Sequence, residues 1–468
     1  MVHIKNADRP FGIRDKIGYL LGDFGNDFTF ILSSSFLLKF YTDVMGVSAY
    51  VVGLVIMFSR LVDAFTDVAM GRICDRQRPT KNGKFKPWIL RMCGPVALSS
   101  FLIYQSAFAD YSMTFKIIWL VITYVLWGSI FYTSINIPYG SMASAISREP
   151  DDRQSLSTFR TMGSTLAGVI IGAGIPLFAY ETVGENTVLS GKAFTTIAGI
   201  FSILAVISYV LCYFLTTERV TPAVSEKREK APVKVLLKSR LSNRALVSII
   251  VASVLMLLAQ LTLQSMANYV YPNYYGSPRA QSASTFAMMG AMLLSAGVAK
   301  PLARKIGKAE MSVLSNLLAA GICFLLFLIR PANVWVYVAL TLICWLGLGI
   351  FSMVSWALIT DVIDYSEIKN GVREDGSIYA LYSFARKLGQ AASAGLTGLL
   401  LSLIGYSQDS AFAPSVLRGI FTISTLVPAI GFVGLSLILW FWYPLKKHAV
   451  EKNVEILREK HENNPQAE

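Results

Sequence analysis

Charged side chains are scarce in this sequence, and so are cysteine and histidine. Asp, Glu, Lys and Arg together make up 15% of the 468 residues, whereas hydrophobic residues make up 54%. A soluble globular chain carries about 25% charged and about 45–50% apolar residues. The composition therefore excludes an ordinary soluble domain and predicts a protein whose solvent is the lipid bilayer.

The few cysteines and histidines exclude several kinds of chemistry. The cysteines stand singly, without a CxxC pair, and we interpret them as small apolar packing residues. The three histidines, His3, His448 and His461, lie near the chain ends, which excludes a histidine relay or zinc site within the membrane. The nucleotide-binding pattern G-x-x-x-x-G-K-[ST] does not occur either. We therefore expect neither an enzyme nor a cofactor.

Long hydrophobic runs dominate what remains. A helix needs about 20 mostly apolar residues to cross a bilayer, and about twelve such stretches follow one another along the chain. They run over residues 17–43, 48–72, 87–108, 113–145, 155–180, 192–216, 245–271, 281–303, 311–329, 334–362, 377–404 and 415–443. This pattern predicts an all-α membrane protein with twelve transmembrane helices.

The basic residues gather at alternate ends of these spans. The net charge is +13, and most Lys and Arg follow even-numbered spans, as in Arg72 to Lys86, Arg219 to Arg244 and Arg304 to Lys308. The positive-inside rule then places both termini and the central loop in the cytoplasm. We expect a multi-pass protein of a bacterial inner membrane, with the bilayer and not nucleic acid as its partner.

One long polar connection divides the spans into six and six. The predicted parts are a bundle over 1–216, a cytoplasmic loop over 217–244, a second bundle over 245–445 and a cytoplasmic tail over 446–468. Two such halves are typical of a membrane carrier. Two alternatives stay open: the loop segment 233–240 is a short interfacial helix or a solvated linker, and the tail is a helix or disordered.

Ionisable residues within the spans indicate where function lies, because a charge at mid-bilayer costs at least about 2.5–3.5 kcal/mol. Arg60, Asp63 and Asp67 share one face of the second span. Two carboxylates one turn apart form an oxygen site suited to Na+ or a proton, and Thr66 adds a hydroxyl. The alternative is that Arg60 neutralises Asp63 as a structural pair.

Polar groups in the first and fourth spans suit sugar hydroxyls. Asp23, Asn26 and Asp27 in the first span offer hydrogen-bond acceptors and a donor. An alternative for Asp23 is a position near the interface. In the fourth span, Thr133 and Asn136 either line a wet cavity or hold helices together, and their spacing does not separate the two.

Charged residues in later spans suggest coupling or gating. Lys387 lies within the eleventh span and needs a counter-charge, for which the carboxylates of the second span are candidates. The alternative places Lys387 at the membrane surface. Arg160, Asp361 and Asp364 lie nearer the cytoplasmic interface, where gating ion pairs and snorkelling side chains look alike, and Arg160 can still reach a substrate.

Motifs spread over most of the chain resemble one known family. The sequence is similar to the glycoside-pentoside-hexuronide:cation symporters of the major facilitator superfamily, which include melibiose and glucuronide carriers. The motifs are GDFGND at 22–27, YTDVMG at 41–46, RLVDAFTDVAMGRICDR at 60–76, GKFKPW at 83–88, NIPYGSM at 136–142, DVIDYSE at 361–367 and GVREDGSIYALYSFARKLGQ at 371–390. The resemblance implies the major facilitator fold of two six-helix bundles.

By this resemblance, Asp27 and Arg160 match sugar-site residues, Asp63 and Asp67 match cation-site carboxylates, and Thr133 matches a further residue of the cation site. Lys387 matches the family's lysine near the ions. Departures from the melibiose carriers occur where they have Asn in the cation motif and an acid in the fourth span, which are Thr66 and Asn136 here. The melibiose specificity and Na+ in particular are therefore not carried over.

These observations predict a secondary transporter that carries a glycoside or pentoside together with Na+ or H+. The substrate site is expected at Asp23, Asn26, Asp27, Thr133, Asn136, Arg160 and Lys387, with the cation at Asp63, Thr66, Asp67 and Thr133, and with Arg60, Lys387, Asp361 and Asp364 in coupling or gating. A hexuronide or other acidic sugar is the alternative. It ranks second because an ionised Asp27 would repel its carboxylate. A carrier of an amphipathic or lipid-like substrate is a second alternative. A monomer is the default expectation.

Overall fold

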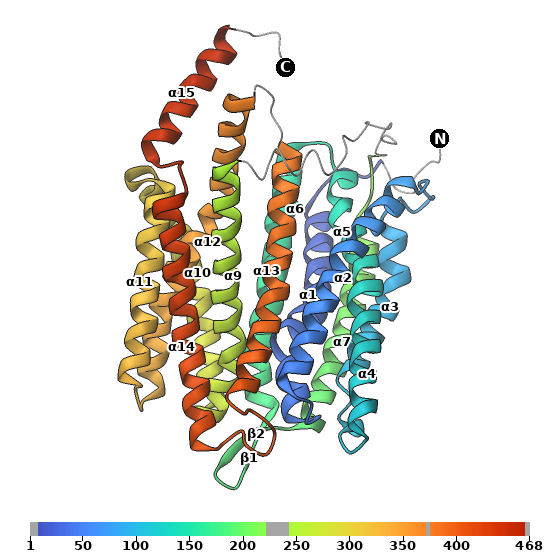
Figure 1. Cartoon of the computed structure of the whole chain (residues 1–468). Helices are drawn as coiled ribbons and strands as arrows, with labels where there is room; N and C mark the ends of the chain where they lie inside the picture. Colours follow the sequence, from blue (N-terminus) through green and yellow to red (C-terminus); the bar gives the residue numbers. More distant parts are fainter. Residues whose placement is uncertain (1–7, 221–242, 371–374, 464–468) are drawn as a thin grey trace. The chain divides into compact units, whose positions relative to one another are not determined.

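The structure is a computed structural model that describes residues 8–220, 243–370 and 375–463. Long helices account for most of it (Figure 1). The chain divides into two compact units. Unit 1 comprises residues 1–228, 276–282 and 398–416, and unit 2 comprises residues 229–275, 283–397 and 417–468.

The helices of the first part of the chain agree closely with the predicted spans. They are α1 (Ile13–Asp43), α2 (Ala49–Arg76), α3 (Lys86–Ile103), the short 3-10 turn η1 (Ser106–Phe108), α4 (Met113–Val125), the π-helix η2 (Leu126–Tyr132), α5 (Thr133–Ile146), α6 (Pro150–Phe178) and α7 (Gly191–Leu215). A hairpin of β1 (Tyr180–Val183) and β2 (Asn186–Leu189) joins α6 to α7, with antiparallel pairing. Helices α4, η2 and α5 form one continuous rod over Met113–Ile146.

The helices that follow residue 243 also agree with their predicted spans. They are α9 (Arg244–Tyr269), the π-helix η3 (Val270–Tyr274), α10 (Pro278–Ile306), α11 (Lys308–Ile329), α12 (Val334–Asn370), α13 (Asp375–Leu403), α14 (Pro414–Leu437), the π-helix η4 (Ile438–Trp442) and α15 (Lys447–Asn463). The tail, for which helix and disorder were both open, is therefore helical in α15. The linker segment 233–240 lies outside the described residues.

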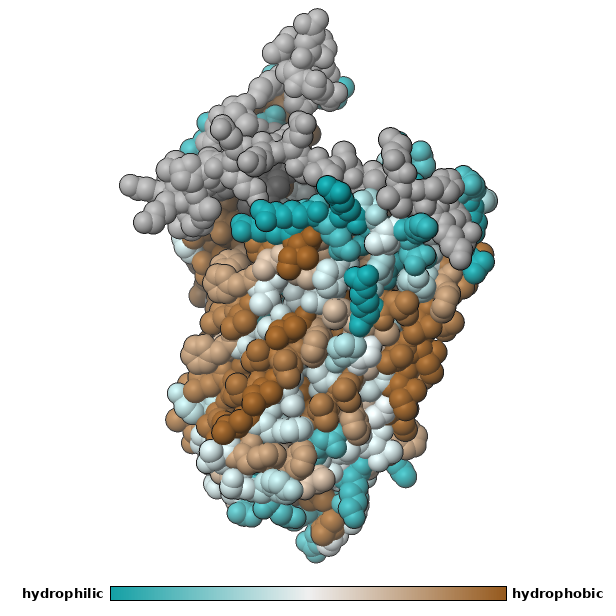
Figure 2. Space-filling view, turned by 90° about the vertical axis from the view of Figure 1, so that its right-hand side faces the viewer, coloured by the Kyte–Doolittle hydropathy of each residue, from teal (hydrophilic) through white to brown (hydrophobic). Residues whose placement is uncertain are grey.

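Eight helices of the described part are long and apolar enough to cross a membrane. Helices α1, α2 and α13 are not among them, and these are the helices that carry Asp23 and Asp27, Arg60, Asp63 and Asp67, and Lys387. Charges at the expected site thus lower the hydropathy of the helices that hold it. The face in Figure 2 shows apolar side chains over its middle and hydrophilic ones gathered towards its ends. The prediction of twelve spans stays a prediction.

Close backbone packing holds α1 against its neighbours in unit 1. A Cβ added at Gly163 of α6 would lie 2.3 Å from the carbonyl oxygen of Leu20, and one at Gly22 would lie 2.2 Å from the Tyr139 ring. Small residues let membrane helices approach closely enough for backbone contact. Tyr19 and Tyr139 stack with ring centroids 4.6 Å apart, and the Tyr139 hydroxyl donates to the Tyr19 carbonyl at 2.6 Å. These contacts fix the position of the first-span carboxylates.

Two buried carboxylates close one end of unit 1. Asp15 is 1% exposed and pairs with Arg9 at 2.6 Å and with Arg219 at 2.8 Å. Glu218 accepts hydrogen bonds from the backbone N–H groups of residues 84, 85 and 86 at the start of α3. Burial raises the pKa of Glu218, and these N–H donors oppose that shift. Arg219 thus ties the segment after α7 to the start of α1, and Glu218 ties it to the start of α3.

Apolar residues of α9, α11, α12 and α14 form the core of unit 2. Its fully buried members include Met256, Leu348, Phe351 and Phe432. Continuous apolar sequence on every side of these helices is typical of membrane-embedded packing. The start of α15 is tied to this unit, because the Lys447 backbone N–H donates to Glu310 at 2.9 Å.

Candidate functional site

The predicted cation residues lie together in unit 1 on one face of α2. Asp63 and Asp67 are four residues apart and so project from the same side of the helix. The side chain of Asp63 is 15% exposed, as is that of Arg60. Sequence spacing therefore placed these groups correctly on one face.

Two hydroxyls from the rod formed by η2 and α5 reach these carboxylates. Ser129 donates to Asp63 at 2.5 Å, and Thr133 donates to Asp67 at 2.9 Å. The π-helix η2 supplies Ser129, and single π-turns within α-helices are frequent at functional sites. We call Asp63, Asp67, Ser129 and Thr133 the carboxylate cluster. Thr133 was expected here, whereas Ser129 was missed, although its place one turn before Thr133 was a usable signal.

Thr66 and Gly128 also lie near the carboxylate cluster. Thr66 donates to the backbone carbonyl of Asp63 at 3.2 Å. That bond occupies its hydroxyl hydrogen within α2. Gly128 lies directly beside Asp63, because a Cβ added there would be 3.5 Å from a carboxylate oxygen. Any other residue at this position would place a Cβ in contact with the Asp63 carboxylate.

Arg60 contacts Asp63 only loosely. The nitrogen-to-oxygen distance is 3.8 Å, beyond hydrogen-bond range. Its guanidinium stacks over Phe30 of α1, 4.7 Å from the ring centroid. Arg60 therefore provides positive charge near Asp63 without closing a tight pair.

The predicted sugar residues of α1 meet α6 and α7. Arg160 donates to Asp23 at 2.9 Å, and Asp23 is 6% exposed. Asn26 accepts from Tyr209 at 2.8 Å, so its side-chain oxygen faces α7. Asp27 is half-buried and lies near Ser164 of α6. The α1–α6 contact thus assembles Asp23, Asp27 and Arg160.

Asn136 and Gly140 lie beside this group on α5. Asn136 is half-buried and forms no hydrogen bond through its side chain within the described residues. A Cβ added at Gly140 would lie 3.9 Å from the Arg160 guanidinium. The Arg160 side chain is itself 40% exposed. Arg160 and Asn136 therefore offer polar groups to a ligand on the α5 side.

The predicted coupling residues of α12 and α13 belong to unit 2. Asp361 pairs with Lys308 at the start of α11 at 2.6 Å. Asp364 and Lys387 are half-buried. The expected pairing of Lys387 with Asp63 or Asp67 joins residues of different units and stays a prediction.

The chemistry of the carboxylate cluster suits a small cation. Carboxylate and hydroxyl oxygens are ligands for hard cations such as Na+. Each hydroxyl also has two acceptor lone pairs beside its one hydrogen, so the same group can donate to an ionised carboxylate or accept from a protonated one. Among the described residues no three His, Cys, Asp or Glu side chains lie together as a metal site. The hydroxyls of Ser129 and Thr133 are the oxygens that these two carboxylates contact across the helix interface.

Comparisons with known proteins identify the family. Residues 18–447 match the family described as MFS/sugar transport protein. The chain is 31% identical to "Uncharacterized symporter YjmB" of Bacillus subtilis over 97% of both chains. It is 30% identical to "Glucuronide carrier protein homolog" of Escherichia coli over 92% of both chains. It is also 31% identical to "Isoprimeverose transporter" of Lactiplantibacillus pentosus over 92% of this chain and 89% of that one.

Solved structures share the fold. The crystal structure of a D-xylose-proton symporter matches with a TM-score of 0.60 and 14% identity, over 92% of this chain and 97% of that one. A bacterial homologue of the lysosomal transporter Spinster matches with a TM-score of 0.64 and 11% identity, over 95% and 97%. These likenesses confirm an all-α major facilitator fold. The family match shows that the chain is a transporter and not an enzyme. The chain belongs to the sugar-transport family of the major facilitator superfamily, as its resemblance to the glycoside-pentoside-hexuronide:cation symporters predicted.

Proposed function

We propose that this chain couples the transport of a sugar to Na+ or H+ by alternating access. The carboxylate cluster carries the proposal, since two carboxylates on one face of α2 each meet a hydroxyl of the η2–α5 rod. Negative charge within the membrane is costly, and a bound cation or proton reduces that cost. The coupling ion therefore binds at Asp63 and Asp67.

The sugar binds nearby in unit 1, at Asp27, Asn136 and Arg160. Hydroxyls of a sugar donate to carboxylates and accept from a guanidinium, and these residues supply both kinds of partner. Cation binding removes negative charge from the interior before the sugar adds its own polar groups. Lys387 of α13 takes part as a counter-charge that the cation displaces.

A neutral glycoside or pentoside is the first candidate for the substrate. Arg160 already pairs with Asp23 at 2.9 Å, and Asp27 adds a carboxylate that would repel an acidic sugar.

An acidic sugar is the second candidate. The bond from Arg160 to Asp23 uses its Nε, so other N–H groups of a 40% exposed guanidinium remain for a carboxylate or sulfonate. Relatives named "Glucuronide carrier protein homolog" and "Putative sulfoquinovose importer" favour this direction.

Uptake into membrane vesicles tests the coupling. Asp63→Asn and Asp67→Asn should each abolish accumulation driven by an imposed Na+ or pH gradient. Asp75→Asn, an exposed residue at the end of the same helix, is the matched control and should accumulate sugar normally. Full cation-driven accumulation in both cluster variants would disprove the cation site.

A panel of labelled sugars tests the substrate class. Neutral glycosides, pentosides and hexuronides are offered separately, with the Na+ and pH gradients imposed one at a time. Preferred uptake of a neutral sugar supports the first candidate, and preferred uptake of a hexuronide supports the second. The proposed function would be contradicted if no sugar were taken up under either gradient.

A further inference from the structure

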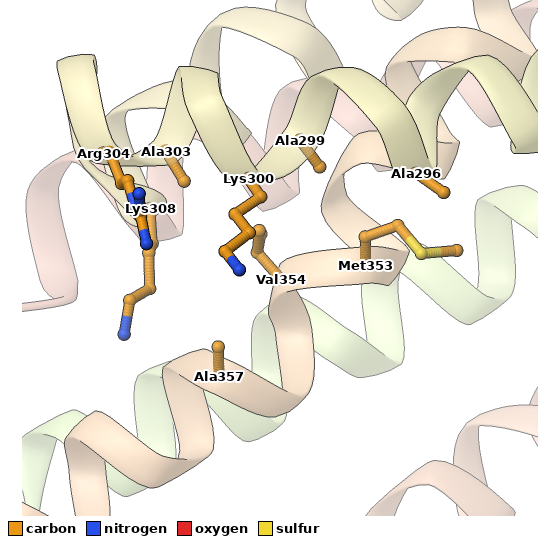
Figure 3. A pocket seen from close by; sticks show the side chains of 9 residues that line it. All are labelled: Ala296, Ala299, Lys300, Ala303, Arg304, Lys308, Met353, Val354 and Ala357. Carbon is orange, nitrogen blue, oxygen red and sulfur yellow. The ribbon is translucent and has the colours of Figure 1, made fainter. Parts of the chain in front are cut away.

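Unit 2 contains a pocket lined by basic side chains between α10 and α12. Its volume is about 470 Å³, and its charged lining residues are Lys300, Arg304 and Lys308 (Figure 3). Lys300 and Arg304 are one helical turn apart on α10, and Lys308 follows the turn into α11. All three side chains extend from α10 and its junction towards α12. We call this site the basic pocket.

Small residues give the basic pocket its space. The α10 wall carries alanines at the same helical spacing as the basic residues, and α12 provides the opposite wall. These apolar lining residues are Ala296, Ala299, Ala303, Met353, Val354 and Ala357. Alanine side chains leave room beneath the longer basic ones. A ligand here meets cationic groups at one end and an apolar wall at the other.

The basic pocket has more basic side chains than acidic side chains that pair with them. Lys308 pairs with Asp361 at 2.6 Å, and the other carboxylate oxygen of Asp361 has no hydrogen-bond partner within the described residues. Lys300 and Arg304 form no ion pair with an acid in the described part of the chain. Like charges one turn apart on a helix repel each other, and a bound anion would relieve that repulsion.

We propose that the basic pocket binds an oxyanion, such as the phosphate, sulfonate or carboxylate group of a small ligand or of a lipid headgroup. Arg304 supplies a planar fork for two oxygens, and Lys300 supplies a mobile point charge. On the predicted topology this end of α10 faces the cytoplasm, so the ligand enters from that side. The pocket is separate in sequence from the predicted cation and sugar residues of unit 1.

The competing explanation is that these positive charges only orient α10 in the membrane. Lys305 distinguishes this explanation from an oxyanion site. Lys300, Arg304 and Lys305 are all exposed, but Lys305 does not line the basic pocket. If these charges only orient the helix, replacing Lys305 should have the same effect as replacing Lys300 or Arg304. If they form a binding site, replacing Lys305 should leave anion binding unchanged. Lys305→Gln is therefore the matched control for Lys300→Gln and Arg304→Gln.

Titration of the purified full-length protein with inorganic phosphate and sulfate at low ionic strength tests the proposal. Calorimetry should show saturable binding that is at least tenfold weaker in Lys300→Gln and Arg304→Gln and unchanged in Lys305→Gln. Thermal unfolding without ligand verifies that all variants fold alike. An equal loss in Lys305→Gln would overturn the proposal.

A lipid experiment identifies the source of the oxyanion. The same proteins are exchanged into phosphatidylglycerol or phosphatidylcholine vesicles, and the retained lipid is measured by mass spectrometry after extraction. Phosphatidylglycerol retained by the native protein and lost in Lys300→Gln and Arg304→Gln assigns the pocket to a headgroup. Saturable phosphate binding without such retention assigns it to a soluble anion. The proposal would be refuted if the native protein showed no saturable anion binding and no selective lipid retention.

Discussion

Gly128 of η2 lies beside the Asp63 carboxylate. A Cβ added at Gly128 would be 3.5 Å from a carboxylate oxygen, in van der Waals contact with it. A Na+ ion needs that space for itself or for a water ligand. A proton needs much less, so the same position distinguishes the two ions.

We expect Gly128→Ala to weaken coupling by Na+. The cation concentration for half-maximal sugar uptake should rise by roughly tenfold, which corresponds to about 1.4 kcal/mol. Uptake measured against external Na+ checks this. Gly174→Ala on α6 is the control, because a Cβ there meets no atom within 4 Å. An unchanged Na+ dependence would indicate that the proton is the coupling ion or that the cation lies elsewhere.

At the scale of elements, the end of α1 contains a buried ion pair. Lys39 is 1% exposed and pairs with Asp43 one turn later at 2.6 Å. Tyr406, in the segment between α13 and α14 that belongs to unit 1, accepts from Lys39 at 3.0 Å and donates to Asp43 at 2.8 Å. The three side chains fasten this segment to α1.

Removing one partner of this pair should destabilise the protein. Asp43→Asn removes the carboxylate with which the buried Lys39 pairs, and loss of one partner of a buried ion pair costs about 3–5 kcal/mol in comparable sites. The double variant Lys39→Met with Asp43→Leu removes both charges and should recover most of that loss. Thermal unfolding midpoints in detergent measure the difference. If the double variant is no more stable than Asp43→Asn, lost packing and not an unpaired charge explains the effect.

At the scale of the whole molecule, the predicted topology is testable with single cysteines. The five native cysteines are buried, so an added one should react alone with a membrane-impermeant maleimide. We expect Glu185→Cys, at the tip of the β1–β2 hairpin, to react from outside intact cells. Glu455→Cys on α15 should react only after permeabilisation. Labelling of both from outside would refute the cytoplasmic location of the C-terminus.

Coupling between ligands is the second property of the whole molecule. If one cation raises the affinity for sugar by a given factor, sugar must raise the affinity for that cation by the same factor, and such factors are commonly about 5–150-fold. Calorimetric titrations of each ligand, with and without the other, measure both factors. Two binding affinities that do not depend on each other would leave no basis for symport.

Much of the fold was predictable from the sequence, because the bilayer imposes helices of known length and apolar composition. The predicted span 113–145 corresponds to the rod over Met113–Ile146, and the span 311–329 to α11 (Lys308–Ile329). Helical periodicity likewise placed Asp63 and Asp67 on one face of α2. These are local properties that neighbouring residues in the sequence decide.

Only tertiary structure decided which groups meet. The π-helix η2 brings Ser129 to Asp63, Asp23 and not Asp27 pairs with Arg160, and Tyr209 engages Asn26. None of these contacts follows from spacing along one helix, because each joins residues whose helices approach through backbone packing elsewhere. The sequence by itself determined the helices and the charges they carry, and the packing of small residues between helices determined the partners of those charges.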